Sequence, residues 1–245
     1  MKEKRQLSLE EKVRKDFKNK EESRVIPDWR ACQIMRPNEA VRKQVKKNWD
    51  SIAKPLDGMG SFETLTAKIG AIQNTDDPKV KERAVLIFCA DNGIVEEGVS
   101  QSGQEVTLAV MKSMARKHSS VGKMAKTAGA DTLVVDIGVN TKERVEGVLS
   151  CKIRPGTRNF LKEPAMTEEE TLAAIDTGIR LVRQCKENGY ALLATGEMGI
   201  GNTTTSSAVV AALLQKSSEE ITGRGAGLSD EGLCRKRQVI AQALE

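Results

Sequence analysis

The sequence predicts an α/β protein: a doubly wound, mostly parallel sheet in a Rossmann-like three-layer arrangement, with a small N-terminal helical appendage. Three short apolar runs alternate with helix-like segments, and this alternation is typical of parallel strands covered by helices. The runs are 84–90, 132–138 and 190–194. The first is continuously apolar, as expected for a strand buried on both faces. Polar or glycine-rich clusters lie at the ends of these strands, which is where such sheets bind ligands.

We expect two regions, an N-terminal helical arm or small domain over residues 1–75 and an α/β nucleotide-binding domain over residues 76–245. The arm begins with residues 1–24, in which Lys, Arg and Glu surround apolar residues spaced four apart. This spacing favours a helix with one thin apolar stripe that packs on the protein itself or on a partner. A disordered charged arm is the alternative. The stripe consists of Leu9, Val13 and Phe17.

Two more helices are predicted in the arm. Asn38 is a favourable N-cap residue and is expected to begin a helix that continues to about Ala53, before Pro55 breaks the pattern. A second amphipathic helix is expected over 62–73, with its larger apolar residues on one side: Leu65, Ile69 and Ile72. These helices would form an appendage or an arm exchanged between subunits.

In the α/β region each strand is followed by at least one predicted helix. Thr167 and Glu170 form a capping-box pattern at the start of one of these helices. Ser229 caps the last one, with Asp230 and Glu231 in its first turn. The helices are expected over 104–117, 120–128, 167–187 and 206–215, and from Ser229 onward.

Composition excludes several classes of function. The net charge of +5 (39 basic minus 34 acidic residues) is spread along the chain, and only 3% of residues are aromatic, so no nucleic-acid partner is expected. No apolar run reaches the roughly 18 residues of a membrane span, and the N-terminus lacks the apolar core of a signal peptide. We therefore expect a cytoplasmic protein that makes no membrane contact.

The cysteines and the histidine do not predict a disulfide framework or a metal site. The five cysteines are scattered without any C-x-x-C pair, and His118 is the only histidine. Cys89 lies inside an apolar strand and is interpreted as a core residue, and His118 is expected to have no chemical role. Neither a metal nor a cofactor is predicted.

The stretch Thr195–Thr205 is the strongest candidate for a binding site. It contains three glycines between a strand and a helix, so backbone N–H groups and the positive end of a helix meet there, and such a place suits a phosphate. The spacing fits neither Gly-x-Gly-x-x-Gly nor a P-loop, which disfavours dinucleotide oxidoreductases and nucleoside triphosphatases. Tight strand–helix packing and simple helix capping are the alternative explanations. Glu197, a negative charge within an anion site, must have another task.

Three further residues have two possible roles each. Asp91 and Asp136 lie at strand ends and either belong to the site or cap the following turns. Lys236 follows the glycine-rich loop 223–227 and is either a phosphate counter-ion or part of a solvated helix face.

Several blocks of sequence together resemble the nicotinate-nucleotide:dimethylbenzimidazole phosphoribosyltransferases of cobamide lower-ligand assembly. Each block is short, but their order from about residue 30 onward is specific. They are Ala90–Gly93, Glu97–Ser100, Gln104–Thr107, Asp136–Val139, Gly156–Phe160, Gly196–Thr205, Gly223–Leu228 and Lys236–Arg237.

The resemblance implies a reaction in which an aromatic base, such as 5,6-dimethylbenzimidazole, displaces nicotinate from C1′ of nicotinate mononucleotide with inversion. The product is α-ribazole 5′-phosphate, formed for cobalamin biosynthesis. A carboxylate must accept the proton of the incoming base, and no metal or redox cofactor is required. Glu197 is the candidate catalytic residue, in an auxiliary role. The resemblance places Ser100 and Gln104 in the base pocket and implies a dimer.

Backbone N–H groups and a cation would hold the 5′-phosphate. With Asp91, the candidate substrate-binding residues are Ser100, Gln104, Gly199, Gly201, Asn202, Thr203, Gly225 and Lys236.

Two departures from the family pattern matter. The family's principal general-base glutamate belongs to a glycine-rich segment that would follow Glu245, so we expect a fragment or a short paralogue that works with another subunit. Asn92 stands where many members carry histidine. The alternative function is a non-catalytic or partner-dependent mononucleotide-binding subunit. A phosphate-binding, kinase-like enzyme is disfavoured because the P-loop lysine is absent.

Overall fold

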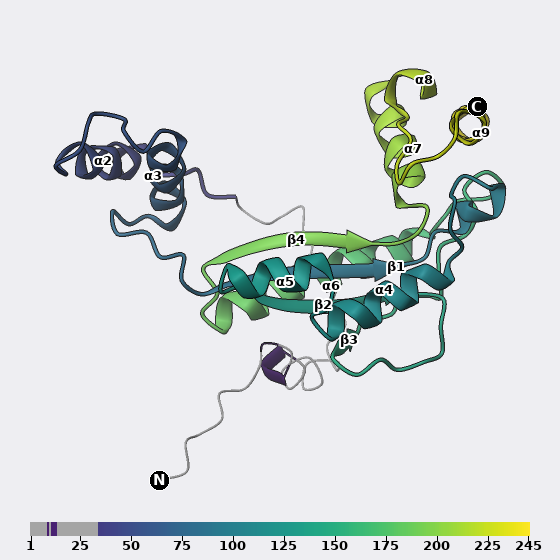
Figure 1. Cartoon of the computed structure of the whole chain (residues 1–245), viewed down its shortest axis with the longest axis horizontal. Helices are drawn as coiled ribbons and strands as arrows, with labels where there is room; N and C mark the ends of the chain where they lie inside the picture. Colours follow the sequence, from purple (N-terminus) through teal and green to yellow (C-terminus); the bar gives the residue numbers. More distant parts are fainter. Residues whose placement is uncertain (1–8, 10, 14–33) are drawn as a thin grey trace, which may run out of the picture. The chain divides into compact units, whose positions relative to one another are not determined.

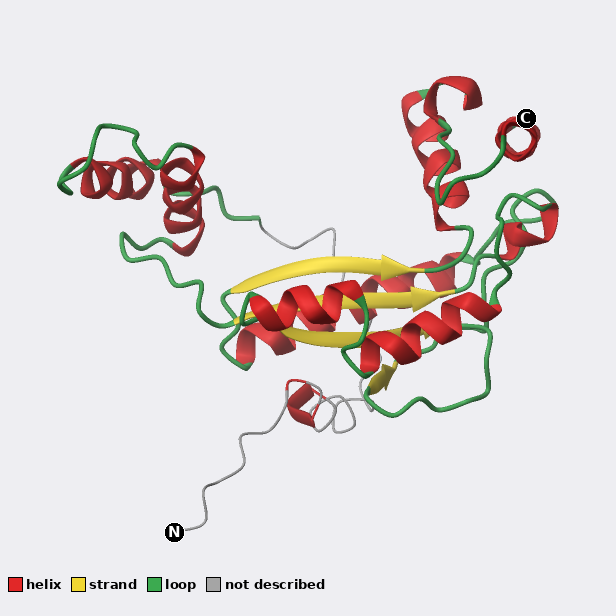
Figure 2. Cartoon of the chain, viewed as in Figure 1, coloured by secondary structure: helices red, strands yellow, loops and turns green. Residues whose placement is uncertain are grey.

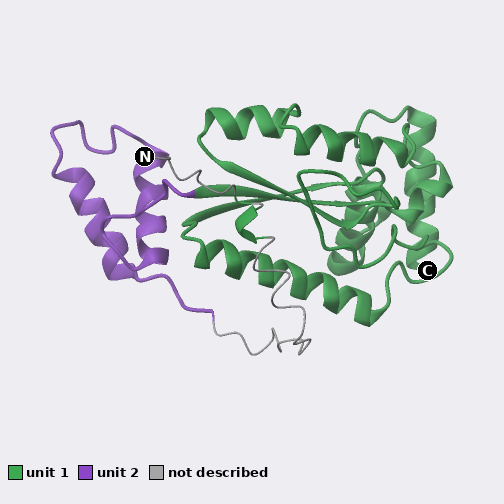
Figure 3. Ribbon diagram, turned by 90° about the horizontal axis from the view of Figure 1, so that it is seen from below, with its two compact units in different colours: residues 1–26, 83–245 green, residues 27–82 purple. Residues whose placement is uncertain are grey.

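The computed structural model describes residues 9, 11–13 and 34–245. The chain divides into two compact units, one of residues 27–82 and the other of residues 1–26 together with 83–245 (Figure 3). Phe17, the third member of the predicted N-terminal stripe, lies outside the described residues. Leu9 and Val13 are buried in the core of the larger unit, which agrees with an apolar stripe packed on the protein itself.

The described residues of the smaller unit, 34–82, form two helices, α2 (Glu39–Asp50) and α3 (Ser61–Gln73). Asn38 caps α2 as predicted, since its side-chain oxygen accepts hydrogen bonds from the N–H groups of Ala40 and Val41 at 3.0 and 3.3 Å. The helix ends three residues before the expected Ala53, because Ser51 already caps it.

The side of α3 that packs on α2 is not its large apolar side. Leu65 and Ile72 are 54% and 70% exposed, whereas the buried residues of this helix are Glu63, Ala67, Gly70 and Ala71. Gly70 is required at the contact, because a Cβ there would lie 2.7 Å from Val45 Cγ2. Close approach of the two helices therefore selects small residues, and the larger apolar side chains remain on the other side of α3.

The larger unit is built on a four-stranded sheet of order β3-β2-β1-β4, in which all neighbours are parallel (Figures 1 and 2). The strands are β1 (Arg83–Ala90), β2 (Asp131–Gly138), β3 (Val148–Ser150) and β4 (Leu192–Met198). Helices cover both faces, with α4 (Glu105–Ala115) and α5 (Ser120–Thr127) on one side and α6 (Glu168–Glu187) on the other. The predicted α/β fold with parallel strands is confirmed.

The two faces of β1 contribute to two separate cores, as its continuous apolar run predicted. Ala84 and Leu86 pack with the N-terminal residues and with Leu181 and Cys185 of α6. The alternate residues, Ile87 and Cys89, pack with residues of α4 on the opposite face. Burial raises the pKa of the Cys89 thiol to about 12, so this cysteine is a core residue, as interpreted from the sequence.

The strand β4 is longer than the sequence predicted. It pairs with β1 as far as Met198, so Thr195, Gly196 and Glu197 belong to the strand, and the turn itself is only Gly199–Gly201. This corrects the expected strand end at residue 194, because pairing with β1 overrides the local glycine signal. The strand also lies at an edge of the sheet and is largely exposed.

Within residues 83–245, three further helices and a 3₁₀ segment complete the set of elements. The capping box at the start of α6 is present, with Thr167 Oγ1 accepting from Glu170 N at 3.1 Å and Glu170 Oε2 accepting from Thr167 N at 2.8 Å. Within the described part of the chain, no helix is both long and apolar enough for a membrane crossing. The remaining elements are the 3₁₀ helix η2 (Gly93–Glu97), α7 (Asn202–Leu214), α8 (Ser218–Ile221) and α9 (Asp230–Leu244).

Candidate functional site

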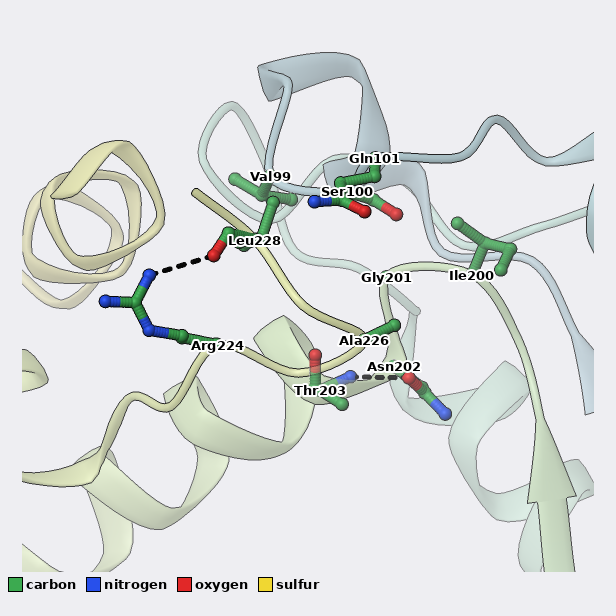
Figure 4. A pocket seen from close by; sticks show the side chains of 10 residues that line it. All are labelled: Val99, Ser100, Gln101, Ile200, Gly201, Asn202, Thr203, Arg224, Ala226 and Leu228. Atoms are coloured by element: carbon green, nitrogen blue, oxygen red, sulfur yellow. Dashed lines mark hydrogen bonds between the residues drawn. The ribbon is translucent and has the colours of Figure 1, made fainter. Parts of the chain in front are cut away.

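A pocket lies beyond the carboxyl end of β4, between three loops that are distant in sequence (Figure 4). One loop follows η2, the second is the turn between β4 and α7, and the third is the glycine-rich loop before α9. The lining residues are Val99, Ser100, Gln101, Ile200, Gly201, Asn202, Thr203, Arg224, Ala226 and Leu228. A hydrogen bond from the Gln101 amide to the Gly227 carbonyl joins the first loop to the third.

The turn from β4 into α7 needs glycine at two positions. A Cβ on Gly199 would collide with the carbonyl oxygen of Ala90, so this residue permits the close approach of the turn to β1. Gly201 is the N-cap of α7 and has φ 89°, a left-handed conformation that side chains rarely adopt. Tight strand–helix packing, one of the alternatives for these glycines, is therefore real, and it coexists with a helix N-terminus directed at the pocket.

Two backbone N–H groups at the start of α7, those of Asn202 and Thr203, already have hydrogen-bond acceptors within the protein. Its side-chain oxygen accepts from Thr203 N at 2.7 Å, and its side-chain amide donates to Glu197 Oε1. Its own backbone N–H donates to the Gly199 carbonyl at 3.0 Å. Glu197 does not line the pocket but reaches it through this amide. The negative charge of Glu197 is thus held by Asn202 and kept beside the helix N-terminus.

Lys236 is the most unusual residue of the site. Its side chain is 1% exposed, and Nζ donates to Thr203 Oγ1 at 2.8 Å and to the Gly223 carbonyl at 3.2 Å. No carboxylate lies within ion-pair distance of Nζ among residues 34–245 and the few described before them. Burial lowers the pKa of this lysine. The alternative of a solvated helix face is therefore wrong for Lys236, because α9 presents it to the interior beside the turn.

The glycine-rich loop approaches this lysine closely. Gly225 has φ 60°, and a Cβ on it would lie 2.7 Å from Thr203 Oγ1 and 3.5 Å from Lys236 Nζ. The lysine, the threonine hydroxyl and the backbone of the loop therefore meet directly behind the pocket, which Thr203 lines and Lys236 and Gly225 do not. Together they can hold an anion with a buried cation and with neutral donors.

Of the remaining predicted residues Ser100, Gln104 and Asp91, only Ser100 lines the pocket. Ser100 lines it, and its Oγ accepts from Ser102 N at 3.3 Å. Gln104 does not line it and instead donates to the Asn92 carbonyl at 3.1 Å. Asp91 is buried, with Oδ2 accepting from Asn140 N at 2.7 Å and with Oδ1 lacking a hydrogen-bond partner in the described structure.

Asp136 fits its capping alternative. Its Oδ1 accepts from Val139 N at 2.9 Å, and its Oδ2 lies 3.1 Å from Lys152 Nζ. The carboxylate is thus fully occupied in fixing the turn after β2, and it does not line the pocket.

Sequence reasoning missed a second cation and the apolar wall of the pocket. Arg224 donates to the Leu228 carbonyl at 2.9 Å and pairs with Asp230, so its charge is balanced, unlike that of Lys236 (Figure 4). Val99 and Leu228 are buried at the pocket wall. Arg224 and Val99 could both have been chosen from the sequence, since Arg224 lies within the glycine-rich loop and Val99 within the block Glu97–Ser100.

The comparisons with known proteins cover most of the chain. A family model described as "Phosphoribosyltransferase" matches residues 34–245. A curated nicotinate-nucleotide–dimethylbenzimidazole phosphoribosyltransferase of Acetivibrio thermocellus is 44% identical over 201 residues, which is 82% of this chain and 57% of that protein. The enzyme of the same name from Clostridium tetani is 40% identical over 215 residues, 86% of this chain and 59% of that protein.

The solved structures give the same result. The crystal structure of CobT from Thermus thermophilus matches with a TM-score of 0.78 and 39% identity, over 84% of this chain and 62% of that one. This chain thus spans about three fifths of the length of these relatives. On the family match, these identities and the shared fold, the chain belongs to the nicotinate-nucleotide–dimethylbenzimidazole phosphoribosyltransferase family.

Proposed function

We propose that the pocket binds nicotinate mononucleotide and that the protein takes part in moving its 5-phosphoribosyl group to 5,6-dimethylbenzimidazole or a related aromatic base. The products would be α-ribazole 5′-phosphate and nicotinate, as cobalamin biosynthesis requires. The observation that carries this proposal is Lys236, a buried cation with only neutral partners beside the start of α7. A buried charge without a counter-ion is unfavourable, and an incoming phosphate would neutralise it.

The phosphate contacts follow from this lysine. The 5′-phosphate would lie against Lys236, Thr203 and the backbone of Gly225, at the positive end of α7. Ser100 would lie on the opposite side of the pocket, toward the base. Phosphate binding would also place C1′ of the ribose within the pocket, since the sugar is attached directly to the phosphate.

In the reaction, a ring nitrogen of the incoming base forms a bond to C1′ while the bond from C1′ to the nicotinate nitrogen breaks. The electron pair of that bond leaves with nicotinate, and the N–H proton of the base passes to a carboxylate. Glu197 is the carboxylate that we assign to the site in an auxiliary role, in contact with the ribose or the base. Its hydrogen bond from Asn202 holds it at the pocket edge.

One observation favours a second candidate, a mononucleotide-binding subunit without turnover. The two carboxylates that the sequence assigns to the site are both hydrogen-bonded, Glu197 by the Asn202 amide and Asp91, through Oδ2, by the N–H of Asn140. Asp91 is also buried away from the pocket. A partner that supplies a free carboxylate would then complete the catalytic site, either a second copy or a paralogue. We place this activity in the cytoplasm, away from nucleic acid and membranes.

A two-part experiment separates these functions. Isothermal titration calorimetry compares nicotinate mononucleotide with nicotinate riboside, which lacks the phosphate, and we expect only the mononucleotide to bind. Dimethylbenzimidazole is then added, and released nicotinate is measured by chromatography. Release supports the transferase, whereas binding without release supports the binding subunit. If the mononucleotide does not bind, both functions are wrong.

A further inference from the structure

We infer that Asn92 is a positioning residue for the phosphate-binding turn, although it does not line the pocket. This inference rests on the proposed function for its effect on the mononucleotide, but the contacts themselves do not depend on it. Asn92 follows β1 and is the N-cap of η2. It is half-buried and lies more than 100 positions before the turn that it contacts.

The side chain of Asn92 does not cap the helix that it precedes. An N-cap asparagine commonly accepts a hydrogen bond from the first turn of its own helix. Asn92 makes no such bond to η2. One end of its amide bonds instead to the turn between β4 and α7, and the other end bonds to the first part of α7.

The two amide contacts fix the turn and the helix together. The Nδ2 group donates to the Ile200 carbonyl at 3.1 Å, and Oδ1 accepts from Thr205 Oγ1 at 2.9 Å. Ile200 belongs to the turn, whereas Thr205 belongs to the first part of α7. A single planar side chain therefore sets the distance and direction between the turn and the helix N-terminus.

The N–H group of Ile200 is held from a second element. It donates to Oγ1 of Thr107, a fully buried residue of α4, at 3.0 Å. The carbonyl and the N–H of Ile200 are thus both bonded to side chains outside the turn. The Asn92 carbonyl also accepts from Gln104 at 3.1 Å, which fixes the backbone of Asn92 itself.

The side chain of Asn92 packs closely against the two glycines of the turn, Gly199 and Gly201. A Cβ on Gly199 would lie 2.9 Å from Asn92 Nδ2, and one on Gly201 would lie 3.1 Å from Asn92 Cβ. The turn therefore has no room for a side chain at either glycine on the side that faces Asn92. Removal of the amide would leave space and two unpaired polar groups, and the turn would move toward that space.

A shift of the turn would also move the residues that are proposed to bind the phosphate. Gly201 is the N-cap of α7, and Thr203, two residues later, accepts the hydrogen bond of Lys236. Movement of the turn would change the separation between Thr203 and the cation. Asn92 thus acts on the ligand through Gly201 and Thr203 rather than by contact.

The test uses binding of nicotinate mononucleotide by calorimetry. Asn92→Ala removes both bonds, and Asn92→Asp keeps the shape but places an acceptor against the Ile200 carbonyl. We expect each to weaken binding about tenfold, the effect of losing roughly 1.4 kcal/mol of positioning. Thr205→Val should also weaken binding, whereas Thr205→Ser, which keeps the hydroxyl, should restore the wild-type value. Asn92→Asp and Thr205→Val preserve volume and remain informative if Asn92→Ala does not fold.

The matched control is Asn188→Ala. Asn188 is also half-buried, and its amide donates to the Gln184 carbonyl at 2.9 Å, at the other end of β4. Its loss should lower stability without changing affinity. The inference is wrong if the Asn92 variants bind like the wild type, or if Asn188→Ala weakens binding equally.

A second measurement does not need the proposed function. Amide hydrogen exchange of residues 199–205 in the unliganded protein should accelerate in the Asn92 variants and not in Asn188→Ala. If the wild type fails to bind the mononucleotide, the proposed function fails, and exchange alone decides the role of Asn92. Unchanged exchange at residues 199–205 would then overturn it.

Discussion

Glu63 in the smaller unit and Lys236 in the larger unit carry opposite charges and are each only 1% exposed. Their hydrogen-bond and ion-pair partners differ sharply. Glu63 is paired with Lys46 at 2.8 Å and with Lys54 at 2.7 Å, and it accepts from Met59 N at 3.1 Å. Among the described residues, Lys236 has only two neutral hydrogen-bond acceptors, the Thr203 hydroxyl and the Gly223 carbonyl.

The pKa values of the two groups differ in what they say about stability. Hydrogen bonds from Lys46 and Lys54 lower the pKa of Glu63 to about 2, so its surroundings favour the charged form. Burial lowers the pKa of Lys236, so its surroundings disfavour the charged form. A compensated charge stabilises the fold, whereas we interpret the uncompensated charge of Lys236 as a group for binding an anion.

The smaller unit also contains a cluster of three carboxylates whose charge is compensated by a lysine. Carboxylate oxygens of Asp50, Asp57 and Glu63 lie close enough together to hold a metal ion. Lys46 Nζ already lies 2.6–2.8 Å from all three, and these contacts raise its pKa. The ammonium group takes the central place, so we interpret this cluster as part of the α2–α3 packing.

Replacing the uncompensated charge should have the largest effect on binding. Lys236→Met keeps most of the side-chain volume and removes the cation. Affinity for nicotinate mononucleotide should fall about 10- to 100-fold, the loss of one or two charge-assisted hydrogen bonds. Calorimetry measures this. The variant should be at least as stable as the wild type in urea, since a buried charge without a counter-ion has been removed. Unchanged affinity would contradict the contrast with Glu63.

Replacing the compensated charge should lower stability and leave ligand binding unchanged. Glu63→Gln leaves Lys46 and Lys54 without their buried counter-charge, so the smaller unit should unfold at lower temperature, as followed by limited proteolysis within residues 34–82. Binding of the mononucleotide by a folded sample should be unchanged. Asp57→Asn is the control, because Asp57 is mostly exposed and contributes to the same lysine. An equal loss in both variants would show that burial of Glu63 is unimportant.

A backbone change beside Lys236 should have an intermediate effect. Gly225→Ala places a methyl group 2.7 Å from Thr203 Oγ1 at φ 60°, which should cost about 1–2 kcal/mol of stability and weaken mononucleotide binding. Gly223→Ala is the matched control, since a Cβ there meets nothing within 4 Å. Urea unfolding and calorimetry on both variants test this. Equal effects would mean that the loop does not approach Lys236 as described.

The smallest effects should appear in the pH dependence of stability. The folded pKa of Glu63 is about 2, below its ordinary 4.5, so its stabilisation is present above pH 4.5 and is lost as the pH falls toward 2. For Lys236 the folded pKa lies below 10.5, so stability should rise with pH as the pH approaches 10.5. Urea titrations at several pH values would show the first slope disappear in Glu63→Gln and the second in Lys236→Met.

The fold was largely predictable because its local signals agree with its packing. The apolar run of β1, the capping box of α6 and the Asn38 cap all specify structures that form as expected. The three-residue strand β3 was missed, since Val148–Ser150 is too short for any pattern and depends on pairing with β2. The buried side of α3 was also missed, because close helix packing selects Ala and Gly rather than Leu and Ile.

The site was only partly predictable. The glycine-rich stretches marked the turn and the loop, because positive φ values and close backbone contacts require glycine. Burial of Lys236 is a tertiary property of α9 packing on α7, so the sequence left its role open. The roles of Asn92 and Gln101 arise from side chains that reach across the sheet or between loops, and no local pattern encodes such contacts.

The hydrogen bond within the start of α7 also bears on how fast a ligand can bind. The Asn202 side chain already accepts a hydrogen bond from Thr203 N, so the phosphate of the proposed ligand would gain this donor only after that side chain rotates away. Association would then proceed through a fast encounter followed by a slower rearrangement, with a rate below that of a preformed anion site. Stopped-flow traces should saturate with ligand concentration in the wild type. Asn202→Gly should remove the slow step.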